Sequence, residues 1–200
     1  MSWIKHPVVL EGDYVRLVPL TSDHFEALAV AANDSRIWEH QVIDGTDRRQ
    51  LTANLREGIM KRAHGEQYPF TVIDRLTGRA YGVTRFFEIF EQHKKVEIGW
   101  TWYHPDYWGT GYNYECKLLL LTYCFEVLKT HRVQIKTRVT NERSKAAIRK
   151  LGAIEEGILR KDRTMPNGEV RDTIMFSIID DEWNDVKKYL KEKVSGIGVK

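Results

Sequence analysis

The spacing of hydrophobic residues changes several times along the chain, and each change marks a new predicted element. Residues 14–19 alternate as a short strand, and Thr21 then caps a helix that runs to Ala32. A second helix is predicted over 47–63. Along it, apolar residues recur every four positions, at Leu51, Leu55 and Ile59.

The hydrophobic period then becomes that of β-structure. Residues 68–74 and 79–87 are predicted as two strands of a hairpin, with Gly78 in the turn between them. A third strand is predicted over 95–103. It ends before Pro105, which constrains the preceding residue and donates no hydrogen bond to a strand ladder.

The rest of the chain alternates between helical and extended patterns. A helix is predicted from Gly111 to about Lys129, and a turn at Pro166-Asn167-Gly168 joins the last two strands. The other predicted elements are a strand over 133–140, a helix over 141–150 that stops at Gly152, strands over 154–159 and 173–179, and a terminal helix from Asp180. This order predicts an α+β fold with a mixed, mostly antiparallel sheet flanked by helices.

Composition narrows the class of protein. The 200 residues are 42% hydrophobic and 30% charged, which predicts one globular domain spanning 1–200. A net charge of +3 is too small to argue for direct nucleic-acid binding, although it suits a phosphate-bearing ligand. The longest apolar run, Leu118 to Leu121, is too short for a membrane helix. Cys116 and Cys124 are expected to be reduced thiols of a cytoplasmic protein, and the histidine spacing predicts no metal site.

The segment from Tyr103 to Asn113 is the most informative one. It reads Tyr-His-Pro-Asp-Tyr-Trp-Gly-Thr-Gly-Tyr-Asn and joins a predicted strand to the N-terminus of a predicted helix. Gly109 and Gly111 would let backbone amides approach an anion closely, as in pyrophosphate sites at helix N-termini. A tight strand-to-helix connection with no ligand explains the same two glycines. The segment lacks the Gly-Lys-Ser/Thr of a Walker loop and the third glycine of a dinucleotide fingerprint.

Three motifs in order give this loop a context: Glu97-Ile-Gly-Trp, the glycine loop with Glu115 beyond it, and Val139-Thr-Asn-x-x-Ser144 leading to Lys150-Leu-Gly-Ala153. Together they resemble the GNAT superfamily of acetyl-CoA-dependent N-acetyltransferases, and specifically its RimJ/RimL-like branch. The resemblance covers nearly the whole chain. It implies a sheet splayed open in the middle, with acetyl-CoA as co-substrate and the pantetheine arm in the gap.

The resemblance also implies site residues. Main-chain groups of Thr101, Trp102 and Tyr103 would bind the pantetheine arm, and Asn141 would bind the arm or a catalytic water. The pyrophosphate would bind the backbone amides of Trp108, Gly109, Thr110, Gly111, Tyr112 and Asn113. Two positions depart from the family. Asp106 stands where an arginine or glutamine is usual, and Ile148 stands where many members have a tyrosine that protonates the departing thiolate.

Two residues are the catalytic candidates. Glu97 matches the family's general base, and strand alternation places it on the same face as Thr101 and Tyr103, although a surface ion pair would explain it too. Ser144 would face the sulfur, whereas helix capping alone explains Ser144 and Asn141 structurally. An acetyl-cysteine route through Cys116 or Cys124 is disfavoured because both lie on an apolar helix stripe.

The leading functional hypothesis is acetyl transfer from acetyl-CoA to a primary amine, either a protein N-terminus or a small molecule. The alternatives are a non-catalytic acyl-CoA-binding module, which the missing tyrosine favours, and an RNA-associated protein. A homodimer paired through an exposed strand at Phe86 to Phe90 is a further expectation.

Overall fold

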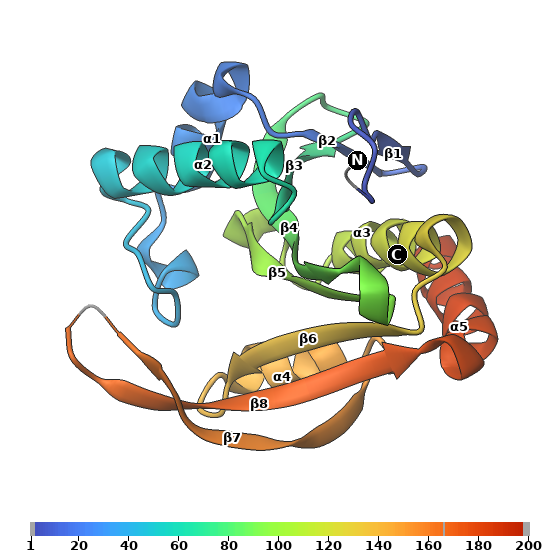
Figure 1. Cartoon of the computed structure of the whole chain (residues 1–200). Helices are drawn as coiled ribbons and strands as arrows, with labels where there is room; N and C mark the ends of the chain where they lie inside the picture. Colours follow the sequence, from blue (N-terminus) through green and yellow to red (C-terminus); the bar gives the residue numbers. More distant parts are fainter. Residues whose placement is uncertain (1–2, 166, 198–200) are drawn as a thin grey trace.

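The computed structural model describes residues 3–165 and 167–197. Its strands are β1 (Leu10–Glu11), β2 (Val15–Pro19), β3 (Tyr68–Asp74), β4 (Ala80–Phe90), β5 (Lys95–Tyr103), β6 (Arg132–Arg138), β7 (Ile154–Thr164) and β8 (Val170–Ile179). Within the described residues they form one sheet in the order β1-β2-β3-β4-β5-β6-β8-β7, shown in Figure 1. Neighbouring strands are antiparallel except β5 and β6, which are parallel.

Helices cover the two faces of the sheet unequally. They are α1 (Phe25–Ala31), α2 (Arg48–Ala63), α3 (Tyr112–Thr122), α4 (Glu142–Arg149) and α5 (Trp183–Ser195). Apolar residues of α3, α4 and α5 share one core with the inner residues of most strands. A second core lies under α1 and α2, against β4 and β5. Among the described residues, no helix therefore covers the face of β6, β8 and β7 opposite α4 (Figure 1).

The predicted order of elements and the α+β fold class are confirmed. Asp47 caps α2, accepting the backbone N–H of Arg49, and Gly152 ends the α4 segment with φ +88°. The strands β4 and β7 are longer than predicted, β1 was not predicted, and α3 continues as a π-helical turn over Tyr123–Leu128. Pro166 of the predicted last turn lies outside the described residues.

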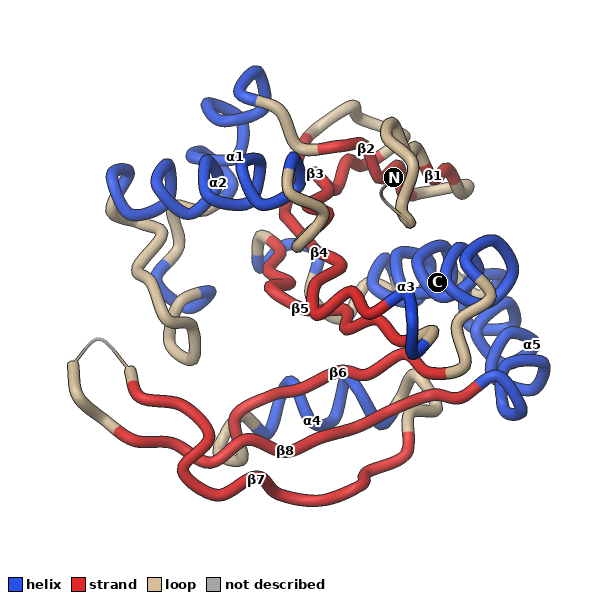
Figure 2. Tube along the Cα trace, in the orientation of Figure 1, coloured by secondary structure: helices blue, strands red, loops and turns tan. Residues whose placement is uncertain are grey.

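The sheet is splayed at its centre, as the resemblance implied. β5 and β6 pair only from Lys95 to Glu97 on one strand and from Arg132 to Gln134 on the other. Beyond these pairs β5 stays with β4 and β6 stays with β8, so the two strands diverge (Figure 2). The opening is a V whose apex lies at Glu97 and whose mouth lies at the ends of β5 and β6.

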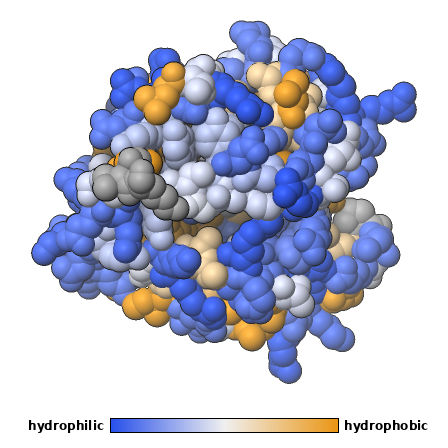
Figure 3. Space-filling model, turned by 180° about the vertical axis from the view of Figure 1, so that it is seen from behind, coloured by the Kyte–Doolittle hydropathy of each residue, from blue (hydrophilic) through white to orange (hydrophobic). Residues whose placement is uncertain are grey.

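The basis for the predicted homodimer is wrong. β4 is an interior strand between β3 and β5, and Phe86 is fully buried, so this strand has no free edge for a second chain. On the face seen in Figure 3, apolar surface occurs as separate small groups among hydrophilic residues. In the described residues, no helix is long and apolar enough to cross a membrane.

Candidate active site

A bulge in β5 sets the geometry of the site. The pairing of β5 with β4 shifts between the Arg85–Gly99 and Val83–Trp102 pairs, so β5 accommodates one extra residue. Trp100 lies in this bulge and has a left-handed backbone conformation, with φ +50°. The Arg85 guanidinium, itself buried, lies 5.1 Å from the centre of the Trp100 ring and favours that conformation by a cation–π contact.

The bulge corrects one prediction. Simple alternation placed Glu97 on the same face as Thr101 and Tyr103, which is wrong because the extra residue reverses the sides. The Thr101 hydroxyl accepts a hydrogen bond from Lys117 of α3 at 3.0 Å, and the Tyr103 hydroxyl lies 3.1 Å from the sulfur of Cys116 on the same helix. Glu97 instead contacts side chains of β4 and β6 that point away from the α3 core.

At the apex of the V, two carboxylates share the same two donors. The side-chain amide of Gln134 lies 2.7 Å from an oxygen of Glu97 and 2.7 Å from an oxygen of Glu88. The Lys136 ammonium lies 2.8 Å from Glu97 and 3.1 Å from Glu88. Glu97 is 2% exposed, so this contact is no surface ion pair. Glu88, Gln134 and Lys136 were not identified from the sequence, because only the pairing of β4, β5 and β6 brings them together.

The two carboxylates have different affinities for a proton. Burial raises the pKa of Glu97 to about 7, although Lys136 and Gln134 act in the opposite direction. Burial also tends to raise the pKa of Glu88. Hydrogen bonding and attraction to Lys136 outweigh this effect and leave the pKa of Glu88 below its usual value. Glu97 is therefore suited to exchange a proton near neutral pH while Glu88 stays ionised.

At the mouth of the V, the glycine loop presents free backbone donors. Within the described residues, the amides of Gly109, Thr110 and Gly111 make no hydrogen bond. Gly109 has φ +74° and faces open space, whereas a Cβ on Gly111 would lie 2.7 Å from Ile197. Gly111 is thus required by packing, and the space beside Gly109 fits the approach of an anion.

Arginines that the sequence did not indicate surround the same loop. Arg143, in the first turn of α4, stacks 3.7 Å from the centre of the Trp108 ring, and Arg36 lies 5.9 Å from it. The indole N–H of Trp108 donates to the carbonyl of Tyr103 at 3.0 Å, which fixes the ring. Asp106 leaves the loop without a cation of its own, but the fold supplies Arg143 from α4, whereas Arg36 is already paired with Asp34.

The short helix α4 places the other predicted residues on the far side of the mouth. The Asn141 side chain caps α4 by accepting the backbone N–H of Ser144 at 3.0 Å, as predicted. The Ser144 hydroxyl is half-buried and forms no hydrogen bond within the described part of the chain. Ile148 is buried in the core, so it leaves no polar group at its position.

Comparisons with known proteins identify the family of this chain. Residues 15–154 match the family model described as an acetyltransferase (GNAT) domain. The chain belongs to the GNAT acetyltransferase family. It is 33% identical over 110 residues to the "Putative ribosomal N-acetyltransferase YdaF" of Bacillus subtilis, a match that spans 55% of this chain and 59% of that relative. These matches bear out the predicted family and its RimJ/RimL-like branch.

Solved GNAT structures share the fold. A GCN5-related N-acetyltransferase from Brucella melitensis superposes with a TM-score of 0.87 at 25% identity, covering 94% of this chain and 86% of that one. RimJ of Mycobacterium smegmatis, solved in complex with CoA-disulfide, superposes with a TM-score of 0.79 at 20% identity, covering 96% of each chain.

Both cysteines of this GNAT domain are buried and unpaired by disulfides. Burial raises the pKa of Cys116 and of Cys124, which disfavours the thiolate that an acetyl-cysteine route requires. Burial also lowers the pKa of Lys117, whose ammonium donates to Thr101. Cys116 and Lys117 of α3 thus contact Tyr103 and Thr101 of β5, on the side of the strand opposite Glu97.

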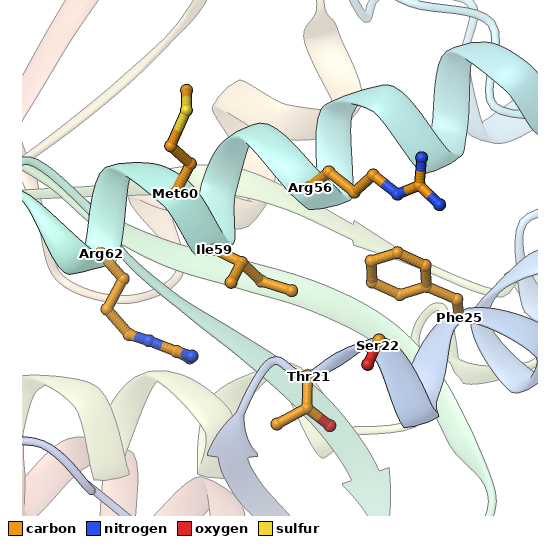
Figure 4. Close-up of a pocket in the computed structure, with 7 residues that line it drawn as sticks. All are labelled: Thr21, Ser22, Phe25, Arg56, Ile59, Met60 and Arg62. Carbon is orange, nitrogen blue, oxygen red and sulfur yellow. The ribbon is translucent and has the colours of Figure 1, made fainter.

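A pocket of about 440 Å³ lies elsewhere, between α2 and the residues that precede and begin α1 (Figure 4). It is lined by Thr21, Ser22, Phe25, Arg56, Ile59, Met60 and Arg62. None of the predicted site residues lines it. This pocket is therefore not the reaction site. We place the reaction site at the opening between β5 and β6, where the polar groups described above lie.

Proposed function

We propose that this protein transfers the acetyl group of acetyl-CoA to the α-amine of a protein N-terminus. The observation that carries the proposal is Glu97, a buried carboxylate with its pKa raised to about 7 at the apex of the splayed sheet. An α-amine titrates near 7.7–8.0 and a lysine near 10.4, so a base of this strength is better matched to the α-amine. The names of the ribosomal N-acetyltransferase relative and of RimJ support the same acceptor class.

The residues at the mouth fit acetyl-CoA. The free amides of Gly109, Thr110 and Gly111 would hold the pyrophosphate, with the positive end of the α3 dipole behind them. The main chain of 101–103 and the cap residue Asn141 would line the pantetheine arm. The stacked Arg143 contributes positive charge at the same opening. The two free thiols support a cytoplasmic location as part of the proposal.

Glu97 would take one proton from the ammonium form of the acceptor, which leaves a neutral amine able to attack. When bound, acetyl-CoA supplies the thioester whose C–S bond breaks as the amine nitrogen bonds to the acetyl carbon. The nitrogen would then lose its second proton to water, and water, directly or through the Ser144 hydroxyl that it reprotonates, would deliver a proton to the thiolate. A thiol of ordinary pKa, about 8.5, leaves readily enough that no tyrosine is needed at position 148.

The test is thiol release from acetyl-CoA with short peptides that differ only at the N-terminus. Peptides with a free α-amine should be acetylated, and the same peptides with a blocked α-amine and a free lysine should react far more slowly. Equal rates on the two sets would contradict the α-amine assignment.

A non-catalytic acyl-CoA-binding module is the second candidate, and the buried Ile148 favours it. Such a protein would be stabilised by acetyl-CoA yet release no thiol with any amine of a broad panel. Turnover with any free amine excludes it.

A further inference from the structure

Glu88 is a second acidic residue beside Glu97, and an unusual backbone brings it there. In β4, Phe87 lies across from Glu97, so regular alternation would turn the next residue toward the α3 core. Glu88 instead has φ +45°, within the register shift between Phe87 and Phe90. A left-handed conformation is costly for a residue other than glycine, and such strain concentrates at functional sites. Here its effect is to return the Glu88 carboxylate to the face of Glu97.

The charges at the apex do not balance. Lys136 bridges the two carboxylates, and Gln134 donates to both without adding charge. One ammonium therefore serves two carboxylates. Other cations lie further out: Arg163 is 4.0 Å from Glu88, Lys95 attracts Glu88 from a distance, and Arg132 pairs with Glu156. When Glu97 is ionised, two carboxylates therefore contact one ammonium directly, and the next cation, Arg163, lies at the limit of ion-pair distance from Glu88.

Building on the proposed function, we propose that Glu88 is a positioning and specificity residue of the acceptor site: it draws the cationic amine to Glu97 and prevents Lys136 from neutralising Glu97. Glu88 is about one-third exposed at its side chain, so an incoming ammonium can approach it. Because Lys136 divides its attraction between two carboxylates, Glu97 remains basic enough to accept the proton of the ammonium. Removal of Glu88 would leave Lys136 paired with Glu97 alone.

The test compares Glu88→Gln with Glu91→Gln, which removes one negative charge from the exposed turn that follows β4. The first readout needs no turnover: the Glu97 carboxyl is titrated by carbon-detected NMR in each protein and assigned with Glu97→Gln. Glu88→Gln should lower the pKa of Glu97, and Glu91→Gln should leave it unchanged. An unchanged titration of Glu97 in correctly folded Glu88→Gln would overturn the proposal.

The second readout is steady-state acetylation of short peptides with free N-termini. Glu88→Gln should raise KM for the peptide about tenfold, the scale of one screened charge interaction, and should change KM for acetyl-CoA little. An unchanged peptide KM would overturn the recognition role. If no peptide is acetylated by the wild type while Glu97 still responds to Glu88→Gln, the proposed acceptor class fails and the control of Glu97 by Glu88 stands.

Discussion

Two glutamates are almost equally buried, with Glu97 2% and Glu115 3% exposed, yet they lie in opposite settings. Glu115, in the first turn of α3, accepts three backbone N–H groups, from Asp13 at 2.7 Å, Tyr14 at 2.8 Å and Val15 at 2.5 Å. Backbone donors cannot rotate away as side chains can, so these three hold the Glu115 carboxylate in place and join the start of β2 to α3.

Glu97 has only side-chain partners, Gln134 and Lys136, and both of them are shared with a competing carboxylate, that of Glu88. Its oxygens can exchange a donor for an incoming ammonium, whereas those of Glu115 are committed to the fold. Burial alone therefore does not identify a catalytic base. We propose that the kind and number of donors around each carboxylate separate the two roles, an anchor for Glu115 and a proton acceptor for Glu97.

The largest expected effect is on the rate. Glu97→Gln should lower kcat/KM by about 10²- to 10⁴-fold, the usual contribution of a positioned base. Affinity for acetyl-CoA, measured by calorimetry, should be unchanged because its predicted contacts lie at the mouth of the V. Full activity in this variant would make Glu97 a structural residue like Glu115.

Substitution of Glu115, the other buried glutamate, should lower the stability of the protein and leave its rate unchanged. Glu115→Ala leaves three buried or half-buried N–H groups without their acceptor and should cost about 2–4 kcal/mol of unfolding free energy. Urea unfolding measures the loss, and kcat of the remaining folded protein should stay near that of the wild type. Gly12→Ala should act through the same contact, since its Cβ would lie 2.4 Å from the Glu115 carboxyl carbon. A loss below about 1 kcal/mol for Glu115→Ala would contradict the anchoring role.

The next largest effect is expected in the glycine loop, on the stabilisation of the protein by acetyl-CoA. At 100 times its Kd, acetyl-CoA should stabilise the wild type by about 2.7 kcal/mol, seen as a raised Tm. Gly109→Ala should remove most of this shift by placing a methyl group where the anion binds. Gly78→Ala is a matched control, because Gly78 has φ +71° and equally open surroundings in the turn between β3 and β4. Equal ligand shifts in the two variants would exclude Gly109 from the binding site.

The smallest effect is expected at α4. Ser144→Ala should reduce kcat by about 10-fold or less, because water can also supply the proton to the thiolate. Its Tm should not change, since the Asn141 side chain makes the cap. Asn141→Ala, in contrast, should lose about 0.5–2 kcal/mol of stability. A rate loss beyond 10³-fold in Ser144→Ala would show that its hydroxyl is the essential acid.

Local patterns were sufficient to predict the order of strands and helices, and the family resemblance directed attention to the glycine loop and Glu97, whose roles are proposals. They failed where pairing between distant segments decides the outcome. The extra residue at Trp100 follows from the register of β5 against β4, so alternation gave the wrong face for Glu97. The partners Glu88 and Lys136 are separated by 48 positions, and Arg143 reaches Trp108 only because the sheet opens between them.

The most direct test of the central claim is the pH dependence of kcat/KM for one peptide with the wild type and with Glu97→Gln. Only ionised Glu97 can accept a proton, so the wild-type rate should rise with pH through about 7. Glu97→Gln depends on amine that is already neutral, so its rate should rise only through the pKa of the α-amine, about 7.7–8.0. The gap between the two proteins should therefore narrow as pH increases. A constant ratio of the two rates at all pH values would contradict the role of Glu97 as the base.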